Sequence, residues 1–375
     1  ELSTLTGITA SLTNVDASAT GASGTGLKIS AVSGTSAFTL ANVDATSTND
    51  KGMHLLTISG TAISVAGGSS AVGGTHGLHA TGFSSSSLAI AFTTVTGGSA
   101  QGLLADDFDG SSALTVSTST LGSTAANGLL VQNWAAAGGT VSVSGSTITS
   151  TATTALVFTL LTGATGTLSN VNANGAVYAT LFDSMTNTAV GVTGSTFVGG
   201  SATQTVMLKD STGSAVVMST TSYVYHEILN CNTPPLTIDQ PPAGSTTLVK
   251  DTTVLGAAAQ AVWIKTLSAN VVLLENVNAV AATIAVNIQD ATGSQVAISG
   301  NSVLAGSSDG VRANLLSNTN LTIIDISITA ASAAINIADQ TTGGFVTIRR
   351  VETFGAHATG VVFNALAGTA VTVEH

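Results

Sequence analysis

The stretch from Gly77 to Leu103 reads GLHATGFSSSSLAIAFTTVTGGSAQGL, and it begins and ends with the same Gly-Leu pair. In the last third of the chain, an Ala or Gly before a β-branched residue recurs at steps of 24, 25, 24 and 26 residues, from Ala261-Val262 to Gly360-Val361. Such a period is typical of one supersecondary unit per repeat, stacked on its neighbours to form a continuous core. The Gly-Leu pair itself recurs at steps of 26, 25, 25 and 26 residues, at Gly26-Leu27, Gly52-Met53, Gly77-Leu78, Gly102-Leu103 and Gly128-Leu129.

Short runs of alternating apolar residues fill each repeat, and Gly, Ser, Thr, Ala, Asn and Asp separate these runs. Alternation at a period of two, with many Val, Ile and Thr residues, indicates β-strands. Examples are Val141-Ser-Val-Ser-Gly and Val296-Ala-Ile-Ser-Gly. Side chains that favour helices are scarce, since Lys and Arg together number 8 in 375 residues. The sequence therefore predicts an all-β protein.

A second motif, Leu-x-Asn-Val-(Asp/Asn)-Ala, occurs four times, at residues 12–17, 40–45, 168–173 and 274–279. An Asn side chain can bond backbone groups at a turn, and it can also bond the Asn of the next coil. We therefore predict that one turn of the repeat carries a ladder of stacked amides, formed by Asn14, Asn42, Asn170 and Asn276.

A coil of about 25 residues with two or three short strands and a turn ladder resembles the right-handed parallel β-helix. Pectin-lyase-like proteins and autotransporter passengers have this architecture. The resemblance covers nearly the whole chain and depends on the periodicity. It implies an all-β solenoid of about 14 coils, and the right hand follows from the resemblance and from the usual handedness of crossover connections.

One segment interrupts the repeat. All four prolines, as Pro234-Pro235 and Pro241-Pro242, and the single cysteine, Cys231, lie between Asn230 and Gly256. Because proline cannot donate to a strand ladder, we expect this stretch to leave the stack. The predicted organisation is a solenoid block at 1–229, a Pro-rich insertion at 230–256 and a second block at 257–375.

Charge is sparse, at 7% of residues against about 25% in a typical domain. The net charge of −11 and the pI near 4.6 argue against nucleic acid as a partner. No run of about 20 apolar residues predicts a membrane span. One cysteine, and a start directly in repeat-like sequence, are typical of a secreted protein after removal of its signal peptide. The sequence thus predicts an extracellular or cell-surface location.

Two features predict contacts with other molecules. If the Leu of each Gly-Leu pair points inward, then Leu104, Leu130 and Val157 form an exposed apolar stripe, unless a lateral loop covers it. The strand patterns at both ends of the sequence also lack a polar cap, which favours head-to-tail stacking of copies. The residues expected at those ends are Leu5, Ile8, Val371 and Val373.

Two groups of side chains could hold a metal ion. Asp106, Asp107 and Asp109 offer oxygens that suit Ca²⁺, although the group lacks EF-hand spacing and an acidic turn is the alternative. His54 and His79 share a column in consecutive coils, about 5 Å apart, and could bind Zn²⁺ or Cu²⁺ or simply form a solvated ladder. The sequence predicts no required cofactor.

Enzymes of the β-helix type are similar in using clustered Asp, Arg and Lys residues. The best such cluster in this sequence is Asp309 and Arg312, with Asp290 and Asp339 in adjacent coils, and it is more simply a turn with one solvated Arg. We therefore predict no catalytic residues.

Three functions follow in order. The first is a secreted structural protein that associates with copies of itself into a filament, sheath or surface layer. The second is an adhesin or autotransporter-like passenger that binds a surface or a glycan. The third is a polysaccharide lyase or hydrolase, or a phage tailspike.

Overall fold

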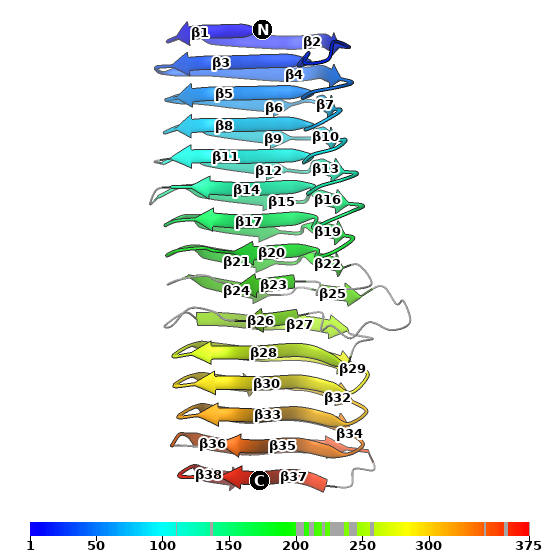
Figure 1. Cartoon of the computed structure of the whole chain (residues 1–375), viewed down its shortest axis with the longest axis vertical. Coiled ribbons are helices and arrows are strands. Elements are labelled where there is room, and N and C mark those ends of the chain that lie inside the picture. The colour runs from blue at the N-terminus through cyan, green and yellow to red at the C-terminus, as the bar shows by residue number, and fades with distance from the viewer. Residues whose placement is uncertain are drawn as a thin grey trace. The chain divides into compact units, whose positions relative to one another are not determined.

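The computed structural model describes residues 1–109, 111–135, 138–199, 206–209, 214–219, 222–225, 236–239, 246–255, 259–340, 343–355 and 359–374. These residues form strands joined by turns, without a helix, and they build a parallel β-solenoid of about 13 turns of about 25 residues (Figure 1). The all-β and parallel-solenoid predictions are confirmed. Among the described residues, no helix is present that is long and apolar enough to cross a membrane.

The chain divides into two compact units, which are described separately: unit 1 is Glu1–Leu181 with Met185–Val190, and unit 2 is Phe182–Ser184 with Gly191–His375. In each unit, one strand per coil pairs in a sheet that we call sheet A, and the other strands pair in sheet B. The strands β20 (Thr180–Asp183) and β21 (Ala189–Thr193) contain residues of both units.

The coils of unit 1 each contribute one sheet A strand, and consecutive strands pair in parallel. These strands are β1 (Leu2–Thr6), β3 (Leu27–Ser33), β5 (Met53–Ser59), β8 (Leu78–Ser84), β11 (Leu103–Asp109), β14 (Leu129–Trp134) and β17 (Leu156–Leu161). Sheet B of unit 1 contains β2 (Thr9–Ala19), β4 (Ser36–Ser47), β6 (Thr61–Ala66), β7 (Ser70–Gly73), β9 (Ser87–Ala91), β10 (Thr94–Gly97), β12 (Ala113–Ser117), β13 (Thr120–Ser123), β15 (Thr140–Ser144), β16 (Thr147–Ser150), β18 (Thr165–Ser169) and β19 (Asn172–Gly175).

Unit 2 repeats the arrangement. Its sheet A contains β23 (Val206–Lys209), β26 (Leu236–Asp239), β28 (Gln260–Ser268), β30 (Ile284–Thr292), β33 (Asp309–Ser317), β35 (Ala333–Gln340) and β37 (Thr359–Leu366). Its sheet B contains β22 (Thr196–Gly199), β24 (Ala215–Ser219), β25 (Ser222–Tyr225), β27 (Thr246–Leu255), β29 (Val271–Ala281), β31 (Gln295–Ser299), β32 (Ser302–Gly306), β34 (Asn320–Ala330), β36 (Phe345–Phe354) and β38 (Ala370–Glu374).

Part of the segment predicted to leave the stack belongs to it. Strand β26 pairs in register with β28, and β27 pairs with β29. Val249 and Val254 of β27 are fully buried. Residues 236–239 and 246–255 contain no proline, so their alternating apolar residues can join the ladder. The four prolines and Cys231 lie outside the described residues.

The recurring glycine of the Gly-Leu pairs marks a point where the backbone of another segment passes very close. A Cβ atom on Gly52 would lie 2.5 Å from the backbone nitrogen of Val72. A Cβ atom on Gly102 would lie 2.5 Å from the carbonyl oxygen of Gly122. Because backbone atoms cannot move aside cheaply, only glycine fits these positions in unit 1. In unit 2 the corresponding Ala261 is fully buried, so the coils there leave room for a methyl group.

Residues with positive φ recur once per coil at the turn that carries the Leu-x-Asn-Val motif. Asn14, Asn42, Asn170 and Asn276 have φ between 52° and 55°. Asn tolerates this left-handed conformation because its short side chain can bond locally. The sequence motif therefore reflects backbone geometry at this turn as well as side-chain stacking.

Buried hydroxyl groups bond the backbone at the corners of the coils. The Oγ atoms of Ser86, Ser112 and Ser119 accept hydrogen bonds from the N–H groups of Thr61, Ser86 and Thr93, at 3.1 to 3.2 Å. Each bond joins one coil to the next where strand pairing is interrupted. This satisfies backbone groups that would otherwise be buried without a partner.

Candidate functional site

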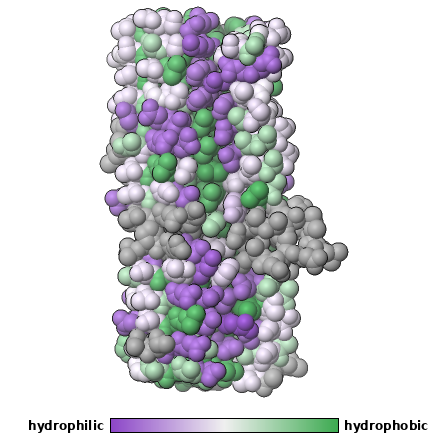
Figure 2. Space-filling model, viewed as in Figure 1, coloured by the Kyte–Doolittle hydropathy of each residue, from purple (hydrophilic) through white to green (hydrophobic). Residues whose placement is uncertain are grey.

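The outer face of sheet A offers one side chain per coil at the position that follows the core residue of each strand. Strand pairing places these side chains in one row within each unit, which we call the outer row. The outer row of unit 1 consists of Lys28, His54, His79, Leu104, Leu130 and Val157. The outer row of unit 2, as far as it is used below, consists of Thr237, Trp263, Asn287, Arg312 and Asn336. Figure 2 shows polar and apolar surface side by side over the sheet A strands of unit 1, and largely polar surface over those of unit 2.

Three histidines stack in unit 1. The ring centroids of His54 and His79 are 5.1 Å apart, and those of His76 and His79 are 5.0 Å apart. Burial lowers the pKa of His54 and of His79 to about 4, and the nearby charge of Lys51 lowers both further. The pKa of His76 is also lowered, mainly by burial. All three imidazoles are thus neutral at pH 7.

The sequence placed His54 and His79 in one column, and the structure also brings His76 against them. The rings stack with interplanar angles of 13° and 22°, which does not direct their nitrogens to one point. Among the described residues, no group of three or more His, Cys, Asp or Glu side chains is placed to hold a metal ion.

The apolar part of the outer row is buried, which corrects the prediction of an exposed stripe. Leu104, Leu130 and Val157 are in register, and they are only 7%, 9% and 7% exposed. Leu181 packs against the cluster. Each side chain is covered by its neighbours in the adjacent coils, so the row offers little apolar surface to a partner.

The acidic run lies along β11. The Oδ1 atom of Asp106 accepts a hydrogen bond of 2.8 Å from Asn133 Nδ2. Asp107 has a φ of 55° and is exposed, and Asp109 is exposed at the end of the strand. Because inward-facing Phe108 separates Asp109 from the other two, the three carboxylates do not converge on one point.

The outer row of unit 2 contains polar atoms that are buried without a partner. They are Thr237 Oγ1, Trp263 Nε1 and Asn287 Oδ1, on three consecutive sheet A strands. Thr237 is 0% and Asn287 is 6% exposed, and Trp263 between them is partly exposed. Asn314, one coil further on and two residues along the strand from the outer row, also has an unpartnered Oδ1 atom.

The charged groups beside this row are paired within the chain. Lys265 Nζ lies 2.9 Å from the carboxylate of Asp239 and 4.3 Å from the ring centroid of Trp263. Arg312 Nη2 lies 2.6 Å from the carboxylate of Asp309, which is 1% exposed. The row therefore presents amides, an indole and neutralised ion pairs.

The carboxylates that the sequence suggested as an acid–base cluster are separated. Strand register places Leu315 between Asp290 and Asp339 in one column. Asp309 lies at the start of β33, level with Ile284 and Ala333 of the adjacent strands. These residues therefore do not form a convergent set.

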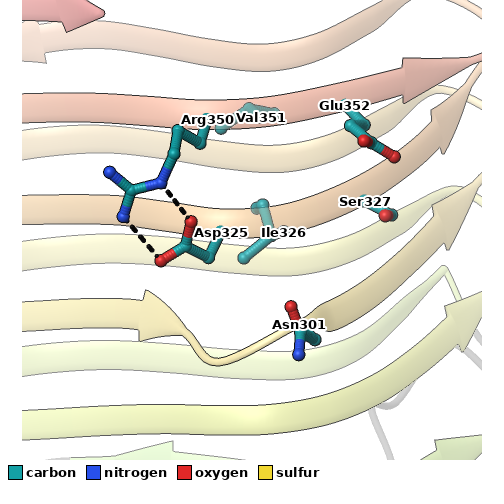
Figure 3. Close-up of a pocket in the computed structure, with 7 residues that line it drawn as sticks. All are labelled: Asn301, Asp325, Ile326, Ser327, Arg350, Val351 and Glu352. Carbon is teal, nitrogen blue, oxygen red and sulfur yellow. Dashed lines mark hydrogen bonds and ion pairs between the residues drawn. The ribbon is translucent and has the colours of Figure 1, made fainter. Parts of the chain in front are cut away.

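A second polar column borders an open pocket of about 470 Å³ in unit 2, at the positive-φ turn after the sheet B strands. Figure 3 shows Arg350 and Asp325 side by side on adjacent coils, with Asn301 one coil further. Arg350 Nη2 donates to Asp325 Oδ2 at 2.8 Å, and this ion pair lowers the pKa of Asp325. The position continues the predicted amide ladder with charged residues.

Two of the four predicted ladder residues bond across coils. Asn42 Nδ2 donates to Asn14 Oδ1 at 2.6 Å, and Asn276 Nδ2 donates to Asp251 Oδ1 at 2.5 Å. Asn170 Nδ2 instead bonds Ser169 Oγ at 3.4 Å. These contacts stabilise the turns and leave the side chains exposed to solvent.

The residues predicted at the ends lie in the first and last described coils. Leu5 and Ile8 are half-buried, and Val371 and Val373 are 40% and 57% exposed. Val371 and Val373 pair in register with Val346 and Ile348, which are 0% and 3% exposed. The core columns are therefore open at the last coil.

Sequence reasoning missed the outer row of unit 2. The signal was present, because the rule that placed Lys28 and His54 outside the core also places Trp263 and Asn287 outside when it is applied to Ala261-Val262 and Ala285-Val286. Their burial and lack of partners could not be seen from spacing.

Comparison with known proteins adds little. No family model and no curated protein matches the chain. The Streptococcus pneumoniae surface protein and adhesin PfbA matches 84% of this chain and 91% of its own, with 8% identity and a TM-score of 0.29. A polygalacturonase from Erwinia carotovora ssp. carotovora matches 90% of this chain and 88% of its own, with 10% identity and a TM-score of 0.25. Likenesses of this size carry no argument about function, and the strand pairing itself shows that the chain is a parallel β-solenoid.

Proposed function

We propose that this chain is a binding module whose outer row in unit 2 holds a neutral glycan. The observation that carries the proposal is the set of unpartnered atoms on Thr237, Trp263 and Asn287. A buried polar atom without a partner costs about 1–3 kcal/mol, and few such atoms occur in native proteins without a reason. A ligand rich in hydroxyl groups can supply both donors and acceptors.

The neighbouring groups favour a sugar over a charged ligand. Lys265 and Arg312 are already paired with Asp239 and Asp309, so the face offers little net charge. The partly exposed indole of Trp263 gives an apolar surface for a sugar ring, and coils repeat polar groups about every 4.8 Å. Trp263 and Arg312 flank Asn287, and a small movement of either side chain opens its amide to a ligand.

The chain is expected to bind a neutral oligosaccharide on a glycan array, with the affinity then measured by calorimetry. Trp263→Ala is expected to weaken that binding at least about tenfold, because it removes the stacking surface and one donor. Asn287→Ala is expected to weaken it as well. The control is Thr329→Ala, an exposed position on sheet B, which should leave the affinity unchanged. Equal affinity of Trp263→Ala and the unmodified chain would contradict the proposal.

The second candidate function is head-to-tail association of copies. The observation that favours it is the open core column at Val371 and Val373 in the last described coil. An open strand edge pairs readily with a further strand, and repeated heterologous contacts give an open filament. A further coil supplied by a second copy would bury these side chains. Filament and glycan-binding roles are compatible with an extracellular or surface location.

Association is expected to appear as concentration-dependent filaments in electron microscopy and as a rising sedimentation coefficient. Val371→Lys should abolish it, because a charged group would enter the column that continues the core from Val346. Thr372→Lys is the matched control, since Thr372 follows the outward-facing Thr347 and should leave association intact. Dispersed single particles at every concentration would exclude this candidate.

A further inference from the structure

The histidine cluster of unit 1 combines partial burial with missing hydrogen-bond partners. Five of the fourteen unpartnered buried polar atoms in the described residues belong to it. They are His54 Nε2, Thr75 Oγ1, His76 Nδ1, His79 Nδ1 and His79 Nε2. Such a concentration of unsatisfied groups on an outer face points to a ligand.

The surroundings of the cluster are basic in composition but neutral in balance. Lys28 on β3 lies 3.0 Å from Glu1, and Lys51 lies 3.0 Å from Asp50. These lysines and His54 line an open pocket of about 410 Å³, together with Glu1 and Asp50. On the other side, His79 faces Asp106 of β11, and His76 bonds Gln101.

Acid changes this balance in one direction. Hydrogen bonds from Lys28 hold the pKa of Glu1 below its usual range. Burial raises the pKa of Asp50, but hydrogen bonds from Lys51 and Thr25 outweigh it and hold that pKa low. These two carboxylates therefore stay ionised while the imidazoles begin to charge. Protonation adds up to three positive charges beside two lysines, and stacked imidazolium rings about 5 Å apart need counter-charge.

We propose that His54, His76 and His79, with Lys28 and Lys51, form an acid-dependent binding site for an anionic oxygen group such as the sulfate or carboxylate of an acidic glycan. Protonated imidazoles are donors at both ring nitrogens, so they match acceptor-only anions. At neutral pH the site is closed to anions because the rings carry no charge and each lysine is paired. The site is separate from the outer row of unit 2 and does not depend on the function proposed there.

The test measures linkage between proton and anion in the intact chain. Histidine pKa values are followed by NMR in sodium sulfate and in sodium chloride of equal ionic strength. Sulfate is expected to raise the pKa of His54 and His79 by about one unit, and sulfate affinity at pH 4.5 should exceed that at pH 7.5 about tenfold. Equal pKa values in the two salts would overturn the proposal.

Variants separate the site from general attraction to a chain that loses negative charge in acid. His79→Gln should remove the gain in affinity at pH 4.5, while Lys265→Gln and Trp263→Ala in unit 2 should retain it. A full gain in His79→Gln would overturn the proposal. A heparin-derived hexasaccharide is the second probe: tighter binding than inorganic sulfate supports an acidic glycan as the ligand, and equal binding supports a free anion at the same site.

Discussion

Phe108→Ala is expected to lower the free energy of unfolding of unit 1 by about 3–5 kcal/mol. Phe108 is fully buried between Phe83 and Trp134, with ring centroids 4.6 Å away on each side. Strand register holds these three rings in one column of consecutive coils. Removing the central ring therefore leaves a cavity and ends two aromatic contacts at once.

The measurement is urea denaturation followed by the fluorescence of Trp134 and by circular dichroism, in a Trp263→Phe background. The chain contains two tryptophans, so this background isolates the signal of unit 1. Phe92→Ala is the control, because Phe92 is 63% exposed, and it should change the free energy by no more than about 0.5 kcal/mol. A loss below about 1 kcal/mol for Phe108→Ala would mean that the column does not stabilise the stack.

Acidification from pH 7 to pH 4 is expected to destabilise unit 1 by about 2 kcal/mol through His54 and His79. Burial lowers the pKa of each from the ordinary 6.5 to about 4, so the unfolded chain binds more protons between these values. The contribution to stability is complete above about pH 6.5 and is lost as the pH falls toward 4. Shifts of this size correspond to about 3 kcal/mol per fully buried group, and we reduce this to about 1 kcal/mol each because the rings are partly exposed.

Urea denaturation at pH 7.0, 5.5 and 4.0 in chloride, read from Trp134 fluorescence, measures this slope. The double variant His54→Gln with His79→Gln should show a flatter slope, since Gln does not titrate in this range. If both proteins lose stability equally, the acid sensitivity lies in the carboxylates. In sulfate, the bound anion should restore part of the lost stability of the unmodified chain.

The period and the alternation determined much of this structure. They fixed the all-β class and the parallel coils, because a strand of period two must turn one set of side chains to the core. They also placed His54 and His79 in one column. The Leu-x-Asn-Val motif located a turn whose positive φ favours Asn, which spacing shows directly.

Exposure and partnership needed the tertiary structure. Spacing directed Leu104, Leu130 and Val157 outward, but only the adjacent coils show that these side chains cover one another. His76 lies before the start of β8, so no strand rule could place its ring 5.0 Å from that of His79.

The sequence by itself determined the direction of each side chain relative to its own coil, because alternation is a local property of the backbone. Only the tertiary structure decided which outward side chains are buried, which polar atoms of Trp263 and Asn287 lack partners, and where another backbone excludes a Cβ atom at Gly52. These properties depend on distances between coils that are 25 residues apart in sequence, and the shapes of the intervening turns set those distances.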